Sequence, residues 1–121
     1  MQDFRNLVVW QKSHRLALEA YAECAHLTRG RLFSLRDQLL RAATSVPANL
    51  AEGCGRSGDR DFRRFVRMAL GSASELEYHF LLARDLGVLP DPAYERLASA
   101  AVEVKRMLSG LAQTLSTERK G

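Results

Sequence analysis

The sequence is poor in cysteine, and it has no apolar run long enough to cross a membrane. Its 121 residues include two cysteines, Cys24 and Cys54, which do not form a C-x-x-C motif. The number and spacing of the cysteines do not indicate a disulfide, so we predict two buried thiols in a reducing compartment. No apolar stretch approaches the roughly 18 residues of a membrane span, and the first ten residues lack the pattern of a secretory signal. We therefore expect a cytoplasmic protein that has no membrane partner.

Residue sets that carry catalysis or bind metals are also missing. A di-iron centre in a helical bundle needs two Glu-x-x-His motifs and two further glutamates. The chain has one such motif, formed by Glu23 and His26, because Leu76 stands three residues before His79. The only glycine-rich stretch, residues 55–59, lacks the Gly-Lys-Ser/Thr of a phosphate-binding loop, and no nucleophile-elbow motif surrounds any serine. We predict a protein that is not an enzyme and that holds no metal or cofactor.

What the chain does have is helical periodicity. Apolar residues recur at steps of three and four through four segments, which predicts helices over about residues 6–28, 34–54, 59–86 and 92–115. The length is that of one domain, so we assign residues 1–121 to a single unit. Four helices joined by short loops favour an all-α, up-down-up-down antiparallel four-helix bundle.

The same spacing predicts which side chains face the core of the bundle. The first-helix seam consists of Leu7, Trp10, His14, Ala17, Tyr21, Cys24 and Thr28, widened by Val8, Leu18 and Ala25. The third-helix seam consists of Phe62, Phe65, Ala69, Ala73, Leu76, Phe80 and Ala83. The fourth-helix seam consists of Tyr94, Leu97, Ala101, Val104, Leu108, Leu111 and Leu115.

Local signals predict the helix ends. We expect Gly30 to cap the first helix and Ser34 to cap the start of the second. Asp91 is expected to cap the fourth helix, with Pro92 at its first position. Gly71 lies in the middle of the third helix, where a glycine costs about 1 kcal/mol relative to alanine. We therefore expect a neighbouring helix to approach closely at that point.

The second helix carries the densest pattern, over residues 38–56. Two apolar columns lie side by side on it, and Pro47 should kink it because proline removes a backbone donor. The columns are Leu35, Leu39, Ala42, Val46, Leu50 and Gly53, and Leu40, Ala43, Pro47, Ala51 and Cys54. A helix with so broad an apolar face must contact more than one neighbour. Because one bundle core covers only part of it, the pattern favours assembly with other subunits.

A polar ladder runs beside these columns, and two interpretations of it stand. Its residues are Gln38, Arg41, Ser45, Asn49, Glu52 and Arg56. One interpretation is a solvated face with i,i+4 pairs, such as Glu52 with Arg56. The other is a network that pairs with another helix or a partner. On the second interpretation, the first five residues are candidates for an oligomer interface.

Four segments give the sequence a specific resemblance. They are residues 38–53, 7–12, 69–77 and 86–89, in the order expected of one family. Together they resemble the four-helix bundle proteins, also named the 23S rRNA-intervening-sequence protein family, over about residues 4–111. The resemblance implies a homopentameric ring. Some members are encoded inside rRNA intervening sequences, and the family is similar to accessory proteins of diversity-generating retroelements, which are basic barrels that bind a reverse transcriptase.

Arginine is concentrated in one part of the chain. Between residues 31 and 70 eight arginines face four acidic residues, and this stretch carries the whole net charge of +4. A row of five lies at the start of the third helix: Arg56, Arg60, Arg63, Arg64 and Arg67. Guanidinium groups in a row suit phosphate recognition, so this basic row is the candidate nucleic-acid site. The alternative is a solvated or subunit-facing surface.

Two functions follow from these patterns. The first is a non-enzymatic homo-oligomeric scaffold, a pentamer by resemblance, that presents a basic surface to RNA or DNA. The second is a protein-binding adaptor or accessory subunit without nucleic-acid contact, for which a reverse transcriptase is the partner that the resemblance suggests.

Overall fold

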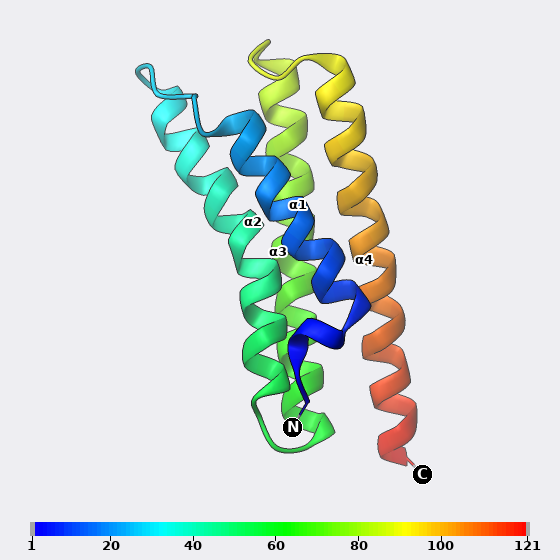
Figure 1. Cartoon of the computed structure of the whole chain (residues 1–121). Helices are drawn as coiled ribbons and strands as arrows, with labels where there is room; N and C mark the ends of the chain where they lie inside the picture. The colour runs from blue at the N-terminus through cyan, green and yellow to red at the C-terminus, as the bar shows by residue number, and fades with distance from the viewer. Residues whose placement is uncertain (1, 121) are drawn as a thin grey trace.

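A computed structural model describes residues 2–120, with side chains described for residues 2–116. It contains a short 3-10 helix, η1 (Phe4–Asn6), and four α-helices: α1 (Val8–Cys24), α2 (Leu32–Cys54), α3 (Asp59–Asp85) and α4 (Asp91–Lys120). Successive helices run in opposite directions and pack side by side (Figure 1). The described residues contain no strand. The all-α, four-helix fold predicted from the sequence is confirmed.

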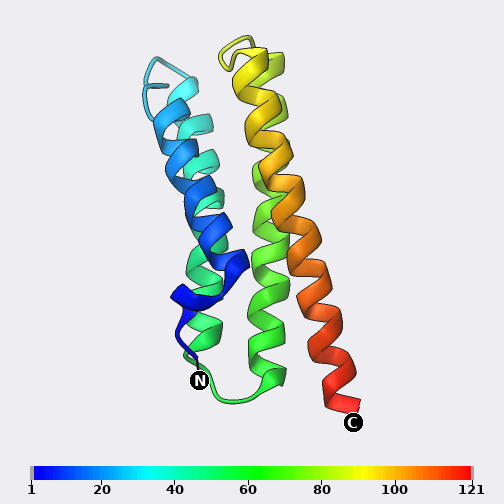
Figure 2. The same ribbon diagram turned by 45° about the vertical axis from the view of Figure 1, so that its right-hand side comes forward.

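The packing is sequential and closes between the first and last helices. α2 packs on α3, α3 on α4 and α1 on α2, and α1 also contacts α4. Figure 2 shows α1 and α2 as one pair beside the pair formed by α3 and α4. None of the helices described here is both long and apolar enough to cross a bilayer.

The end of α1 and the start of α2 differ from the prediction. α1 ends at Cys24, where the N–H of Leu27 turns back to the Cys24 carbonyl at 3.1 Å, so Gly30 does not cap it. Gly30 instead has a φ of +52° and starts α2 two residues early, because its carbonyl accepts from the N–H of Phe33. Ser34 therefore lies inside α2 and is not its cap.

The fourth helix is longer than the prediction at both ends. The Pro90 carbonyl accepts the N–H of Tyr94 at 2.9 Å, which makes Asp91 the first helical residue rather than the cap. At the other end the helix continues to Lys120, because neither glycine nor proline occurs between Leu115 and Gly121. Gly121 itself lies outside the described residues.

Helix α2 is buried along both of its predicted columns. Leu39 and Leu50 are completely buried in the first column, and Leu40 and Cys54 are buried in the second. Contacts with α3 and α1 within the same chain cover both. The expectation that the second column needs another subunit to cover it is wrong, because two intrachain neighbours, not one, flank this helix.

Helices α3 and α4 follow their predicted seams, whereas α1 does not. All seven predicted seam residues of α3 are buried, and so are five of the seven in α4. In α1, His14, Tyr21 and Thr28 are exposed, as are Val8, Leu18 and Ala25. The buried set is Val9, Ser13, Leu16, Ala17, Ala20, Cys24 and Leu27.

The rotation of α1 has a physical reason. The Ser13 hydroxyl donates to the Trp10 carbonyl at 3.0 Å, so this serine is satisfied when fully buried. Small residues at Ser13, Ala17 and Ala20 let α1 lie close to its neighbours. His14 stacks on the Trp10 ring, with centroids 4.8 Å apart, on the outside of the bundle.

Two glycines show where helices meet and where they do not. A Cβ at Gly53 would lie 2.9 Å from the Phe65 Cβ and 3.0 Å from the Phe62 ring, so α2 and α3 are in tight contact here. A Cβ at Gly71 would meet nothing within 4 Å. The close approach expected at Gly71 is therefore absent within the chain, because this position faces outward.

Both cysteines are buried free thiols, as the sequence predicted. Burial, with the neighbouring Glu23 carboxylate as a smaller cause, raises the pKa of Cys24 to about 11. Burial also raises the pKa of Cys54, and the Asp3 carboxylate adds to it. Since the thiolate is the reactive form, neither thiol is an activated nucleophile at neutral pH.

Replacing Leu108 by aspartate should unfold the protein. Leu108 has 0% exposure, so the substitution buries a lone carboxylate, and this costs much of the roughly 5–15 kcal/mol by which a small domain is stable. Leu18→Asp is the matched control, because Leu18 is 59% exposed. Circular dichroism and thermal melting should show a helical, cooperative control and a Leu108→Asp variant that lacks the transition. A native-like melt of Leu108→Asp would contradict the core assignment.

A second pair of variants tests the contact at Gly53. Gly53→Ala should destabilise the bundle by about 1–3 kcal/mol, because the new methyl group overlaps Phe65 and Phe62. Gly110→Ala in α4 should instead stabilise it by up to about 1 kcal/mol, since a Cβ there meets nothing within 4 Å. Urea denaturation measures both, and equal effects would show that α2 and α3 are not in tight contact at this glycine.

Candidate functional site

The five arginines of the basic row lie in different surroundings. Arg60 and Arg67 are exposed, and neither has an ion pair or hydrogen bond within the described part of the chain. The row begins in the loop before α3, at Arg56, and follows the first half of that helix. The structure therefore places two unpaired guanidinium groups on the outer surface of α3.

Arg56 and Arg64 both lie over the ring of Phe65. Their guanidinium carbons are 5.1 and 4.6 Å from the ring centroid, a cation–π arrangement. Arg56 also donates to the Glu52 carboxylate at 2.7 Å, and Arg64 lies 3.7 Å from Asp61. These two cations are thus held against the bundle and partly neutralised.

Arg63 points toward the last helix. It is half-buried, and its Nε donates to the carbonyl of Ala112 in α4 at 3.1 Å. Beside it lies a groove between α3 and α4 with a volume of about 310 Å³. The residues that line it are Arg63, Arg67, Leu70, Ser109, Ala112, Gln113 and Ser116.

Sequence reasoning missed the α4 side of this groove. Ser109, Gln113 and Ser116 are spaced by four and three, so they form one polar stripe on a helix, and Arg106 continues it one turn earlier. That spacing was a usable signal. By itself the spacing indicates an ordinary solvated stripe. The hydrogen bond from Arg63 to the Ala112 carbonyl shows which face of α3 adjoins this stripe.

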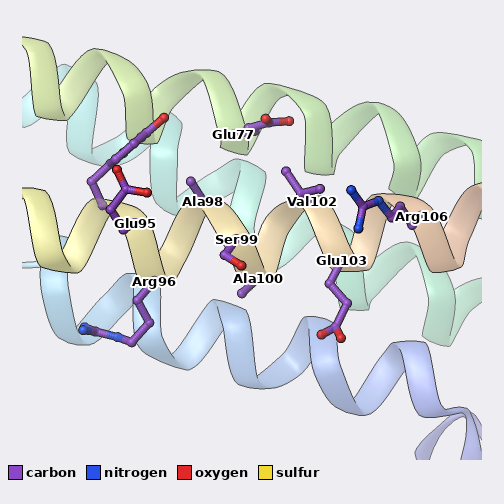
Figure 3. Close-up of a pocket in the computed structure, with 10 residues that line it drawn as sticks. Glu77, Glu95, Arg96, Ala98, Ser99, Ala100, Val102, Glu103 and Arg106 are labelled. Atoms are coloured by element: carbon purple, nitrogen blue, oxygen red, sulfur yellow. The ribbon is translucent and has the colours of Figure 1, made fainter.

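A second depression lies nearer the start of α4 and has a different chemistry. Its volume is about 680 Å³, and α4 residues line it together with Glu77 of α3 (Figure 3). Its charged groups serve neighbouring helices: Arg96 donates to Glu23 at 2.7 Å, and Glu103 lies 3.2 Å from Lys12. Mixed charge and these internal pairs make it a surface where α4 is joined to α1, rather than a ligand site.

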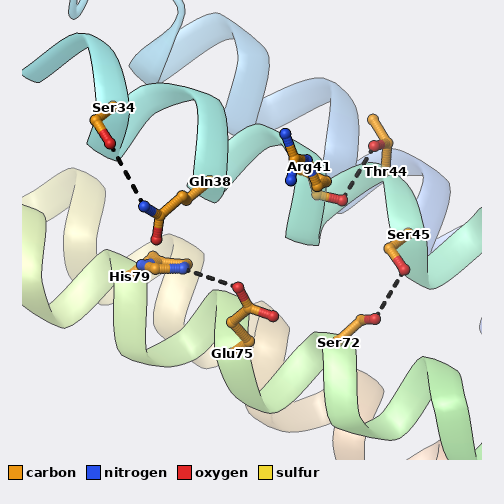
Figure 4. Close-up of polar contacts among 8 residues, drawn as sticks. All are labelled: Ser34, Gln38, Arg41, Thr44, Ser45, Ser72, Glu75 and His79. Carbon is orange, nitrogen blue, oxygen red and sulfur yellow. Dashed lines mark hydrogen bonds and ion pairs between the residues drawn. The ribbon is translucent and has the colours of Figure 1, made fainter.

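The polar ladder of α2 satisfies both interpretations in part. Glu52 and Arg56 form the expected i,i+4 pair, and the Asn49 amide donates to the Ser45 hydroxyl at 3.0 Å. Ser45 also reaches another helix, because its hydroxyl lies 2.8 Å from that of Ser72 in α3 (Figure 4). Gln38 donates to Ser34 at 3.4 Å within α2. Among the candidate interface residues, Arg41 and Gln38 are exposed and the ladder faces outward.

A buried histidine lies at the edge of this ladder. His79 is buried, and its Nε2 lies 3.1 Å from the Glu75 carboxylate (Figure 4). Its Nδ1 has no hydrogen-bond partner among the described residues. The sequence carried a signal for the pair, since Glu75 and His79 are four residues apart on one helix.

Exposed apolar side chains accompany the ladder on the α3 side. Met68 is 46% exposed and Tyr78 is 56% exposed. Gly71 lies three residues after Met68, and Tyr78 lies seven residues after Gly71, so all three share one outward face of α3. This face adjoins the α2 ladder through the contact of Ser45 with Ser72. We call the combined surface the α2–α3 face.

The Glu23–His26 motif serves structure. The Glu23 carboxylate pairs with Arg96, and His26 is exposed. No group of three or more potential metal ligands occurs among the described residues.

Two polar side chains of α3 are paired with neighbouring helices. The hydroxyl of Ser72 contacts that of Ser45 in α2, and the Glu77 carboxylate pairs with Lys105 of α4 at 2.9 Å.

Comparison with known proteins now bears on this arrangement. The structure is similar to a crystal structure of a protein of unknown function from the S23 ribosomal protein family of Bacteroides thetaiotaomicron. The TM-score is 0.80 at 26% identity, covering 86% of this chain and 97% of the other. No curated protein matches the sequence.

A family model matches most of the sequence. It is described as the 23S rRNA-intervening sequence protein and covers residues 5–110. Neither this description nor that of the crystal structure names a catalytic activity. The match covers α1, α2 and α3, α4 as far as residue 110, and the four motifs noted in the sequence. The chain belongs to the 23S rRNA-intervening sequence protein family.

Proposed function

We propose that this protein is a non-enzymatic, homo-oligomeric scaffold that presents its basic row to the phosphate backbone of RNA or DNA. The observation that carries the proposal is the segregation of charge. The whole excess of +4 lies within residues 31–70, and Arg60 and Arg67 within that stretch are exposed without an acidic partner in the described part of the chain. Unpaired guanidinium groups on one surface attract polyanions.

The surroundings of the row suggest how it would bind. Phe62 and Phe65 belong to the core, and Arg56 and Arg64 cover the ring of Phe65. No aromatic ring is therefore available beside the row for base stacking. Binding should depend on phosphates alone and should be nearly independent of sequence.

The α2–α3 face supports the proposed assembly. It combines hydrogen-bonding side chains with exposed Met68 and Tyr78 and with Gly71, which leaves room for a neighbour. Apolar side chains ringed by polar groups are typical of subunit interfaces. We propose a closed cyclic oligomer with five subunits, the number that the family resemblance implies, in which this surface repeats.

A protein-binding adaptor is the second candidate, and the outer face of α1 favours it. Leu18 and Tyr21 are exposed there, and Tyr21 lines a groove between α1 and α2 of about 480 Å³. On this hypothesis the arginines contact a protein, and a reverse transcriptase is the partner suggested by resemblance. Loss of nucleic-acid binding with retention of a protein partner would favour it.

Light scattering should test the assembly. At micromolar concentration we expect the mass of five 13.5 kDa chains. Gly71→Gln should lower that mass, because a side chain placed at an outward glycine blocks a neighbour without disturbing the bundle. Gly110→Gln is the matched control, since a Cβ at either glycine meets nothing within 4 Å. A clean monomer mass for the wild-type protein would remove the oligomer from the proposal.

A salt titration should test the basic row. Arg60, Arg63, Arg64 and Arg67 replaced together by glutamine should flatten the salt dependence of binding, because each lost phosphate contact lowers the slope by about 0.9 on a duplex. Fluorescence anisotropy with a generic RNA and a generic DNA, at low and near-physiological salt, measures it. Circular dichroism checks that the variant remains helical.

The decisive comparison is between the wild-type protein and the quadruple variant at low salt. If both bind equally weakly, the row is a solvated or subunit-facing surface, and the adaptor hypothesis replaces the proposed function.

A further inference from the structure

The five guanidinium groups of the basic row are not equivalent. Arg56 and Arg64 are held on the Phe65 ring and lie beside Glu52 and Asp61. Arg60 and Arg67 have no such partner among the described residues, and Arg63 turns to α4. The row therefore divides into a clamped pair, Arg56 and Arg64, and three cations that neither lie on Phe65 nor have an acidic partner among the described residues; we call Arg60, Arg63 and Arg67 the free set.

Two members of the free set, Arg63 and Arg67, border the groove between α3 and α4, and Arg60 lies one turn before Arg63 on α3. Arg63 and Arg67 form its α3 wall, and the Ala112 carbonyl fixes the Arg63 side chain by accepting from Nε. The hydrogen bond uses one of the five N–H donors of that guanidinium. The guanidinium group that carries the remaining donors is already held in place. Binding an anion therefore costs less side-chain entropy than it would with an unrestrained arginine.

The opposite wall supplies neutral donors. Ser109 and Ser116 of α4 line the groove together with the amide of Gln113. Hydroxyl and amide groups are common donors to phosphate oxygens. None of the described residues that line the groove is acidic. By contrast, the second depression, nearer the start of α4, is lined by Glu77, Glu95 and Glu103.

The length of the free set indicates what kind of anion fits. Arg60 and Arg67 are seven residues apart, which corresponds to about 10 Å along the helix axis. Phosphates of one strand advance by about 3.4 Å each along a duplex axis. Arg60 and Arg67 are therefore separated by roughly three nucleotide steps. This separation matches a continuous phosphodiester backbone and is larger than one isolated phosphate.

We propose that the α3–α4 groove, with Arg60, Arg63 and Arg67, is the phosphodiester-binding subsite of the protein, and that Arg56 and Arg64 do not contact nucleic acid. This inference rests on the proposed function, because it names which part of the basic row binds. It also adds residues of α4 to the interface, with Ser109 at its centre.

Two double variants with equal loss of charge test the division. Arg60→Gln/Arg67→Gln removes two free cations, whereas Arg56→Gln/Arg64→Gln removes the clamped pair. Both are titrated by anisotropy with a fluorescent 20-base-pair duplex at several salt concentrations. The first should reduce the salt slope by about two for each subunit engaged, and the second should leave it near that of the wild-type protein.

A second matched pair tests the groove itself. Ser109→Glu places a carboxylate inside the groove, and Ser99→Glu adds the same charge on α4 about 15 Å away along the helix. Both serines are exposed, so both variants should fold. Ser109→Glu should weaken duplex binding at least tenfold, and Ser99→Glu should change it by less than threefold.

The outcomes separate the two proposals. If the wild-type protein does not bind the duplex even at low salt, the proposed function fails and the subsite fails with it. If both double variants lower the slope equally, or if Ser109→Glu and Ser99→Glu weaken binding equally, nucleic-acid binding stands. The groove is then not the nucleic-acid site, because the electrostatic field of the whole protein supplies the affinity.

Discussion

The contact between α2 and α3 at Gly53 constrains the rest of the molecule. With no room for a Cβ there against Phe65 and Phe62, the two helices pack tightly at this glycine, and the short loop 55–58 joins them. This fixes the rotation of α3 about its axis. Phe62 and Phe65 must then face inward, and the arginines between and beyond them must face the surface or α4. The position of the basic row is thus a consequence of close packing.

Charge elsewhere in the chain is balanced across helices. Lys12 with Glu103, Arg96 with Glu23, and Lys105 with Glu77 join α4 to α1 and α3. Each pair is at least one-third exposed, so each adds little stability. These pairs neutralise charge where α4 faces α1 and α3. Residues outside 31–70 have no net charge, so the basic row and the other arginines of that stretch carry the excess.

The sequence predicted the fold well wherever large apolar residues form long, strict columns. Leu39 and Leu50 in α2, like Leu97 and Leu108 in α4, leave only one way to orient a helix. It failed for α1 because apolar residues surround that helix, and burial there favours the small Ser13 over Tyr21. The α3–α4 groove was predictable only in part: the spacing of Ser109, Gln113 and Ser116 marks a polar stripe on α4, but helical spacing alone contains no interhelical register and does not tell which turn of α4 meets Arg63.

Pro47 divides the most buried helix into two parts. It lies inside α2 and has no N–H to donate to the Ala43 carbonyl, so the hydrogen-bond ladder is interrupted there. Local opening of a helix usually proceeds from its end as a cooperative unit. An opening that begins at the glycine-rich loop after Cys54 therefore meets a boundary at Pro47 after about two turns. No backbone hydrogen bond to the Ala43 carbonyl has to break at that boundary, so the two parts of α2 are coupled less tightly along the helix than through their packing on α3.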